Sequence, residues 1–300
     1  MDRLYQMQVF VAVVDANGFA GAARALNLSP PAVTRAINEL EAQLGARLLT
    51  RTTRVVRVTE AGERYVEDCR RILAELAEAD ESVAGLQAHP RGRLTLTAPV
   101  LFGAQVVTPI VTEYLGLHPL VQAHCWFMDR VVNMMDEGVD VAVRIGELPD
   151  SSLQAIRVGQ VRRVIVATPQ YLLGAPPLQS ADDIHRHTVV TASGLTPTPE
   201  WRLRQGGTAV SVKLQPRMTS TSNDSAIQAC LQHFGLTRLL SYQVAGLVRE
   251  GRLQTVLVDC EPPPLPVHVL HREGRYAAKK ARAFIDLAVE RLRVHPALTL

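Results

Sequence analysis

Residues 28–45 read LSPPAVTRAINELEAQLG, a pattern that predicts one helix with a marked start and a marked end. Ser29 suits the N-cap position, where a hydroxyl accepts from free backbone N–H groups, and the two prolines after it fit the first turn. Gly45 is expected to end the helix. Apolar residues recur at helical spacing and mark the side expected to be buried, namely Ala32, Val33, Ile37, Leu40 and Leu44.

Two shorter helices are expected before this one, and a basic hairpin after it. Residues 4–16 carry apolar side chains at helical spacing, and the alanine-rich residues 19–27 favour a second short helix. Residues 47–51 and 55–58 are β-prone runs joined by a short turn. This order predicts an all-α winged helix-turn-helix over residues 1–59, with the third helix in the DNA major groove and the hairpin as a wing.

Positive charge is concentrated in this region. Between Arg24 and Arg57 there are six arginines and two acidic residues, whereas acidic residues outnumber basic ones between Glu60 and Glu81. One arginine alone is commonly a solvated surface charge, but a cluster on a small domain indicates double-stranded DNA as partner. Arg35 suits either phosphate or guanine. The expected DNA contacts are Ser29, Pro31, Thr34, Arg35 and Asn38 on the third helix, and Arg51, Thr52 and Arg54 on the wing.

Residues 60–89 predict a long linker helix with a dimerisation seam. Apolar side chains recur there at alternating steps of four and three residues, and a sustained seam of this period packs against a partner helix. The alternative is a long amphipathic helix that lies on its own domain. The seam residues are Tyr65, Cys69, Ile72, Leu76, Ala79 and Val83.

A break at residues 89–92 (HPRG) marks the start of a separate domain, residues 90–300. Strands and helices alternate beyond it, which predicts an α/β fold with a mostly parallel sheet covered by helices. Strands are expected at residues 94–97, 121–127, 139–145, 156–167, 188–191, 210–214 and 267–271, and helices from Val100, Arg130, Asn223 and Ser241 and over residues 277–293.

The first 90 residues resemble the LysR-type transcriptional regulators. Gly21 stands where a small polar residue is common in the family, and Leu49 stands where phenylalanine usually precedes the wing arginine. The rest of the pattern is long, ordered and specific. It consists of Phe10, FAGAARAL at 19–26, LSPPAVT at 28–34, INELE at 37–41, LG at 44–45, LLTRTTR at 48–54 and VTEAG at 58–62.

The resemblance extends over the whole chain and implies how it works. The C-terminal part looks like the family's effector-binding domain, similar to periplasmic solute-binding proteins. This implies two α/β subdomains, about residues 91–163 with 267–300, and residues 164–266, with a ligand cleft between them. It also implies a small-molecule effector, in this family often a small organic acid, and dimers that pair into tetramers. RNA polymerase is the further partner that a regulator of this type implies.

Ligands of such folds bind at the carboxyl ends of strands and at helix N-termini. Arg144 ends an expected strand, and its fork matches a carboxylate, although an ion pair with Glu147 or Asp140 is the alternative. Pro99 replaces a hydroxyl that many family members present, and Asp129 would repel an anion if it faced the cleft. The expected effector contacts are Pro99, Val100, Phe127, Asp129, Arg144, Ser193, Ser222 and Asn223.

Composition and missing motifs argue against other classes. Apolar residues make up 47% and charged residues 20% of the chain, so both domains can hold a core. The sequence lacks the glycine-rich, nucleophile-elbow and zinc-protease motifs of common enzymes. Its four cysteines lack zinc spacing, so we expect reduced thiols, no metal and no cofactor. Without a visible signal peptide or membrane span, a cytoplasmic protein with no membrane partner is expected.

Three other functions have less support in the sequence. An enzyme with an appended DNA-binding domain lacks a catalytic motif, since His185 and His187, like His268 and His271, have no carboxylate or cysteine that completes a metal set. A solute-binding transport protein would need an export signal and no 90-residue N-terminal domain. A purely architectural DNA binder would have no use for 200 residues of α/β domain.

Overall fold

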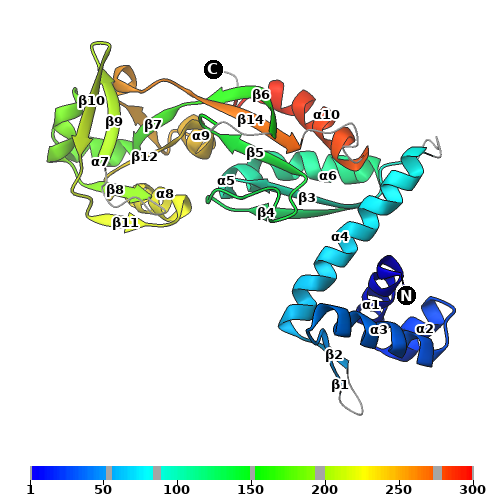
Figure 1. Cartoon of the computed structure of the whole chain (residues 1–300). Helices are drawn as coiled ribbons and strands as arrows, with labels where there is room; N and C mark the ends of the chain where they lie inside the picture. The colour runs from blue at the N-terminus through cyan, green and yellow to red at the C-terminus, as the bar shows by residue number, and fades with distance from the viewer. Residues whose placement is uncertain are drawn as a thin grey trace. The chain divides into compact units, whose positions relative to one another are not determined.

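The chain forms two units, residues 1–88 and 89–300, in the computed structural model drawn in Figure 1. The structure describes residues 2–51, 56–83, 89–148, 153–192, 200–272 and 279–298. The first unit is helical apart from one small hairpin. Its elements are α1 (Arg3–Asp15), α2 (Phe19–Ala25), α3 (Pro30–Leu44), β1 (Leu49–Arg51), β2 (Val56–Val58) and α4 (Glu60–Val83).

The ends of α3 are set by the residues that mark them in the sequence. Ser29 is the N-cap, and its Oγ accepts from the backbone N of Ala32 at 3.4 Å. Pro30 occupies the first helical position. Gly45 ends the helix with φ of 64°, a conformation that glycine adopts at little cost. The helix therefore spans the residues that the sequence predicts for it.

The core of the first unit lies where α1, α2, α3 and the start of α4 meet. The Phe10 and Tyr65 rings lie 5.9 Å apart between α1 and α4. Each large apolar side chain buried in this way contributes about 1.5–3 kcal/mol to folding. This packing fixes the rotation of α3 about its axis. The fully buried side chains include Val9, Phe10, Val13, Val33, Ala36, Ile37, Leu40 and Cys69.

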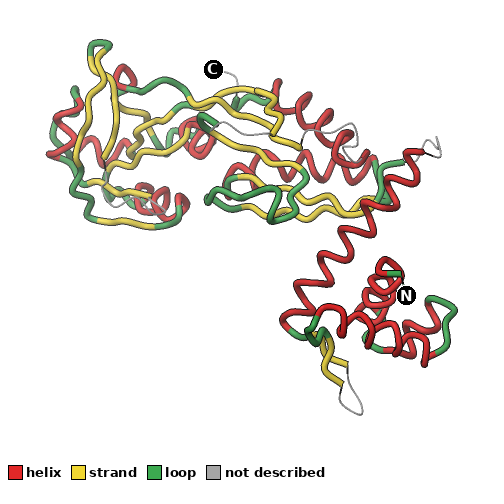
Figure 2. Tube along the Cα trace, viewed as in Figure 1, coloured by secondary structure: helices red, strands yellow, loops and turns green. Residues whose placement is uncertain are grey.

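The second unit contains two five-stranded sheets, and Figure 2 shows helices and strands alternating along it. The first sheet has the order β4-β3-β5-β14-β6, and its elements are β3 (Gly92–Ala98), β4 (Val121–Phe127), β5 (Val141–Ile145), β6 (Leu153–Val161) and β14 (Leu265–Arg272). The second has the order β11-β8-β12-β7-β13, and its elements are β7 (Arg163–Ala167), β8 (Val189–Ala192), β11 (Met218–Ser220), β12 (Leu236–Leu240) and β13 (Gln254–Val256).

Both sheets are mixed, so the expectation of a mostly parallel sheet is wrong. In the first sheet β3 is parallel to β4 and β5, whereas β14 is antiparallel to β5 and β6. In the second, β8 is parallel to β11 and β12, whereas β7 is antiparallel to β12 and β13. The reason is the path of the chain, because β6, β7 and β14 carry it from one sheet to the other and back.

The strand expected over residues 156–167 is two strands, one in each sheet. β6 ends at Val161 and β7 begins at Arg163. Ser241 fixes the break, because its Oγ accepts from the Arg162 backbone N at 3.1 Å and its own backbone N donates to the Arg162 carbonyl at 2.8 Å. The chain returns to the first sheet between Cys260 and Leu265.

The helix expected from Arg130 is wrong, because turns occupy that segment. Asn133 gives the physical reason. Its Oδ1 accepts from the backbone N of Met135 at 3.0 Å and of Asp136 at 3.4 Å, and such local bonds compete with the helical ones. Arg130 closes the loop with two hydrogen bonds to Glu137 at 2.8 and 2.5 Å.

Helices cover the first sheet. α5 (Val100–Phe102), the π turn η1 (Gly103–Val107) and α6 (Thr108–Leu117) form one continuous helix, and α10 (Lys279–Arg293) packs beside it. The Tyr114 hydroxyl donates to the Lys280 carbonyl at 2.7 Å. Among the described helices, only Val100–Leu117 is long and apolar enough to span a membrane, and its Ile110, Val111 and Tyr114 are buried in this unit's core.

The second sheet is covered by the β9–β10 hairpin on one face. Trp201 and Leu203 of β9 are buried with Ile165 and Leu236 of the sheet. Sequence patterns missed β9, β11, β12 and β13, which are short. The remaining elements are α7 (Pro169–Gly174), η2 (Ala181–Arg186), β9 (Glu200–Gln205), β10 (Thr208–Lys213), α8 (Asn223–Leu231), α9 (Ser241–Arg249) and η3 (Val258–Cys260).

Gly103→Ala is expected to destabilise the second unit, because a Cβ at this position lies 2.3 Å from the Phe127 ring. Overpacking of this kind costs about 1–3 kcal/mol in the free energy of unfolding, measured by denaturant titration. Gly116→Ala is the control, because it lies in the same continuous helix with open space at its Cβ. We expect that variant to gain roughly 0.5–1 kcal/mol. Equal effects of the two substitutions would contradict the contact with Phe127.

Candidate DNA interface and effector site

The outward side of α3 brings together residues expected to contact DNA. Pro31, Arg35 and Asn38 are exposed and Thr34 is half-buried. These four lie on one open surface together with Pro30, Glu39 and Ala42. The free N–H groups and the positive dipole end at the start of α3 favour phosphate nearby. Ser29 lies at this end as well, where its hydroxyl already serves as the helix cap.

Glu41 connects α3 to the wing. Its Oε1 accepts from the backbone N of Leu48 at 2.8 Å and of Leu49 at 3.0 Å, where the first wing strand begins. Thr59 closes the other side, because its Oγ1 donates to the Arg47 carbonyl at 2.8 Å. Sequence reasoning missed both positioning residues. The acidic Glu41 amid arginines was the available signal for a structural role.

The wing is an antiparallel hairpin in which Leu49 pairs with Val58 and Arg51 with Val56. Arg51 thus lies at the end of β1 nearest the turn. Thr52 and Arg54, also expected to contact DNA, lie outside the described residues. The basic side chains of this unit described as exposed include Arg24, Arg35, Arg47 and Arg57.

The first half of the α4 seam packs on its own unit, which corrects part of the expected dimer interface. Cys69 is fully buried in the core of the first unit, and burial raises the pKa of its thiol to about 11. Tyr65 and Ile72 pack against the same core. A dimerisation role for Cys69 is therefore wrong, because α1 covers it. Leu76 is 37% exposed, and the side chains of Ala79 and Val83 lie outside the described ones.

Asp129 occupies the helix start that was expected to receive an anion. Its Oδ1 accepts from the backbone N of Val100 at 3.0 Å, while Pro99, the preceding residue, supplies no side-chain cap. The carboxylate therefore takes the first free N–H of this helix and adds negative charge there. An anionic ligand is disfavoured at Pro99 and Val100 for both reasons.

Phe127 and Tyr242 are packing residues near this helix start. The Phe127 ring lies directly over Gly103 and is half-buried in the core. Tyr242, from α9, meets Phe102 edge-on at 5.1 Å between ring centroids. Burial raises the pKa of Tyr242, and the negative charge of Asp129 raises it further.

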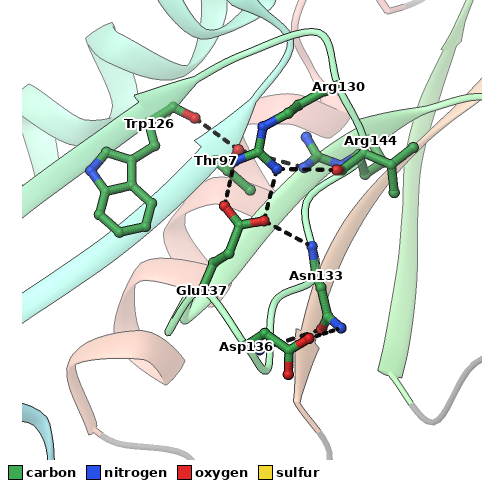
Figure 3. A network of polar contacts seen from close by, with 8 residues as sticks. Thr97, Trp126, Arg130, Asn133, Asp136, Glu137 and Arg144 are labelled. Atoms are coloured by element: carbon green, nitrogen blue, oxygen red, sulfur yellow. Dashed lines mark hydrogen bonds and ion pairs between the residues drawn. The ribbon is translucent and has the colours of Figure 1, made fainter. Parts of the chain in front are cut away.

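Arg144 lies half-buried beside an ion pair that it does not join (Figure 3). Its Nη2 lies 3.5 Å from Thr97 Oγ1, which in turn donates to the Trp126 carbonyl at 2.7 Å. Within the described part of the chain, the carboxylate that acts on Arg144 is that of Glu137, rather than Glu147 or Asp140. Because Arg130 already binds both Glu137 oxygens, this group of three charges keeps one net positive charge.

Ser222 and Asn223 lie at the start of α8, at the edge of the second sheet. Ser222 is the N-cap, and its Oγ accepts from the Ser225 backbone N at 3.3 Å. Asn223 is the first residue of the helix. Ser193 lies outside the described residues.

Reactive thiols and metal ligands are two other features that a functional site can hold. Burial raises the pKa of the Cys230 thiol to about 12. Among the described residues, no group of three or more His, Cys, Asp and Glu side chains is arranged for a metal ion.

Two family models match the chain almost from end to end. Residues 4–63 match the bacterial regulatory helix-turn-helix protein, lysR family, and residues 87–293 match the LysR substrate binding domain.

Relatives of similar length are regulators as well. An HTH-type transcriptional repressor of Pseudomonas aeruginosa strain UCBPP-PA14 is 32% identical over 100% of this chain and 95% of its own length. The HTH-type transcriptional regulator PtxR of P. aeruginosa strain PAO1 is 32% identical over 98% of this chain and 94% of its own. These relatives are transcriptional regulators and not enzymes.

Solved structures agree with the fold. The LysR-type regulator CrgA from Neisseria meningitidis has a TM-score of 0.62 at 27% identity, covering 97% of this chain and 99% of that one. The full-length virulence activator AphB from Vibrio cholerae has a TM-score of 0.60 at 26% identity, covering 96% and 99%. In this chain the helix-turn-helix model matches before the substrate binding domain.

Proposed function

Because this chain belongs to the LysR family of transcriptional regulators, we propose that the outward side of α3 and the β1–β2 wing make its sequence-specific contacts with double-stranded DNA. The protein is an HTH-type regulator whose activity is modulated by a small-molecule effector of its C-terminal domain, and it is not an enzyme. The observation that supports the DNA contacts best is the exposure of Arg35 and Asn38 beside a buried, fixed helix face.

The residue types suit the two kinds of DNA contact. Arg35 and Asn38 lie three positions apart on the exposed side of α3, where a guanidinium reads guanine and an amide reads adenine in the major groove. Arg51 is the last residue of β1, and we propose that its guanidinium contacts the adjacent minor groove or backbone. Thr52 and Arg54 complete the proposed wing contacts, and Ser29, Pro31 and Thr34 the proposed helix contacts.

For the effector, we propose a small organic acid held at Arg144, with Thr97 beside it. A half-buried arginine whose neighbouring carboxylate is already neutralised supports an anion there. Asp129 argues against the start of the helix at Val100 as the place of the carboxylate. Ser193, Ser222 and Asn223 remain proposed contacts from the second sheet.

Oligomeric state, partners and location follow as proposals from the family. We propose homodimers formed through the second half of α4, where Leu76 is exposed on an amphipathic helix. Pairing of such dimers into tetramers, contact with RNA polymerase and a cytoplasmic location are proposed on the same grounds. The two half-sites of a dimer favour an imperfect palindrome as operator.

Arg35→Ala and Arg51→Ala are each expected to weaken operator binding while the fold stays intact, because Arg35 is exposed on α3 and Arg51 is the last residue of the short strand β1. If each contacts one phosphate, the slope of log K against log salt flattens by about 0.9 in fluorescence anisotropy titrations. Arg64→Ala is the control, an exposed arginine of α4 paired with Glu60. Unchanged affinity and slope in both test variants would contradict the proposed interface.

Leu76→Glu is expected to dissociate the dimer, since a charge buried in a helix–helix seam has no partner. Sedimentation velocity measures the change. Ala77→Glu is the control, because it adds the same charge at the next exposed position of α4. An intact dimer in the Leu76→Glu protein would refute the assignment of the seam.

Arg144→Gln is expected to abolish the thermal stabilisation of the full chain by its acid effector. A ligand at 100 times its Kd adds about 2.7 kcal/mol, which a thermal-shift screen of small mono- and dicarboxylic acids detects. Arg186→Gln is the control, an exposed arginine of the same unit. A hit that stabilises the Arg144→Gln and parent proteins equally would place the acid elsewhere.

A further inference from the structure

Two arginines face the same side of the second sheet on neighbouring strands. In the β12–β7 register Arg238 pairs with Ile165 and Leu240 pairs with Arg163. Side chains alternate along a strand, so Arg163, Ile165 and Arg238 point to one face. Ile165 is buried there with Trp201 of β9. Arg238 therefore lies beneath the β9–β10 hairpin, with Arg163 on the same face of the neighbouring strand, and this sheet is a different one from that of Arg144.

Arg163 and Arg238 are both half-buried. Arg238 lies over the Trp201 ring, with 5.4 Å from Cζ to the ring centroid, and its Nη1 donates to the Arg202 carbonyl at 3.1 Å. Burial lowers the pKa of Arg163, and burial together with the charge of Arg163 lowers that of Arg238 to about 10. Over the described stretches of the chain, neither guanidinium forms an ion pair.

The charge next to Arg163 in the sequence, Arg162, is compensated by the chain itself. Arg162 is bound to Glu261 at 3.0 Å, and the Glu261 side chain is 11% exposed. Arg162 precedes β7, next to Arg163, so alternation directs the two side chains to opposite faces and Glu261 serves only the first. Two like charges brought together in a partly desolvated place weaken the fold unless an opposite charge joins them.

We propose that Arg163 and Arg238 bind a small oxyanion in a second ligand site, under Trp201. Two guanidinium forks match the several oxygens of a phosphate, sulfate or phosphoryl group, and the indole bounds the site on one side. The shared chemistry is a compact dianion, either free or carried on an organic molecule. This site is separate from the proposed effector position at Arg144, so an experiment can contradict one of the two proposals without contradicting the other.

The test uses Trp201 as the reporter. The chain has two tryptophans, Trp126 and Trp201, so Trp126→Phe leaves Trp201 as the only one. Sodium sulfate is titrated into the full-length protein, and sodium chloride at equal ionic strength is the control. A third titration with methyl phosphate tests an anion carried on an organic molecule. We expect a saturable change in emission and a rise in Tm of roughly 5–10 °C at 100 times the Kd, which chloride does not reproduce.

Arg163→Gln tests the assignment. This variant should lose the saturable response and, in sulfate-free buffer, melt no lower than the parent protein, because it relieves a repulsion. Arg163→Lys keeps a charge without the fork and should bind more weakly. Arg252→Gln, an exposed arginine of the same unit, should respond like the parent. The proposal is overturned if sulfate and methyl phosphate act no differently from chloride, or if Arg163→Gln responds as the parent does.

Discussion

Burial of Val33, Ile37 and Leu40 against α1 fixes the rotation of α3, and the DNA interface depends on that contact. A helix held by one fully buried side presents the opposite side without freedom to turn, which leaves Arg35 outward. The same helix carries Glu41, whose carboxylate holds the start of β1. Glu41 thus ties the start of β1 to α3, and for the proposed DNA interface such a fixed connection would lower the ordering cost of binding.

How far the sequence predicts this fold depends on where the deciding contacts lie. The bounds of α3 were predictable because Ser29 and Gly45 act on their own neighbours. The period of α4 was equally clear, but a period shows only that a side is apolar. It does not say what covers that side, because α1 and a partner helix would bury the same residues. Cys69, which the core of its own unit encloses, shows the difference.

In the α/β unit, too, contacts between residues distant in the sequence decide what local patterns cannot predict. Alternating strands and helices predicted the class, but the apolar run through Arg162 gives no local sign that the chain changes sheets there, since the break is held by the distant Ser241. The turns around Asn133 had a local signal, a side chain that bonds to the backbone two and three residues on. Arg144 was found as a candidate, yet its environment depends on Arg130 binding Glu137, which only the folded chain shows.

Charge compensation separates the structural arginines of this unit from those that face a ligand. Arg130 and Arg162 each have a carboxylate supplied by the chain, so their contribution to stability is present without any ligand. Arg144 and the pair Arg163 and Arg238 lack one within the described residues, so folding leaves part of their desolvation cost without an offset. Under the two proposals, an anion that supplies the missing charge would favour the arrangement that it binds best, and it would shift the unit toward that arrangement by as much as its preference for it. A half-buried cation without a carboxylate partner would then be the means by which a small molecule acts on this unit.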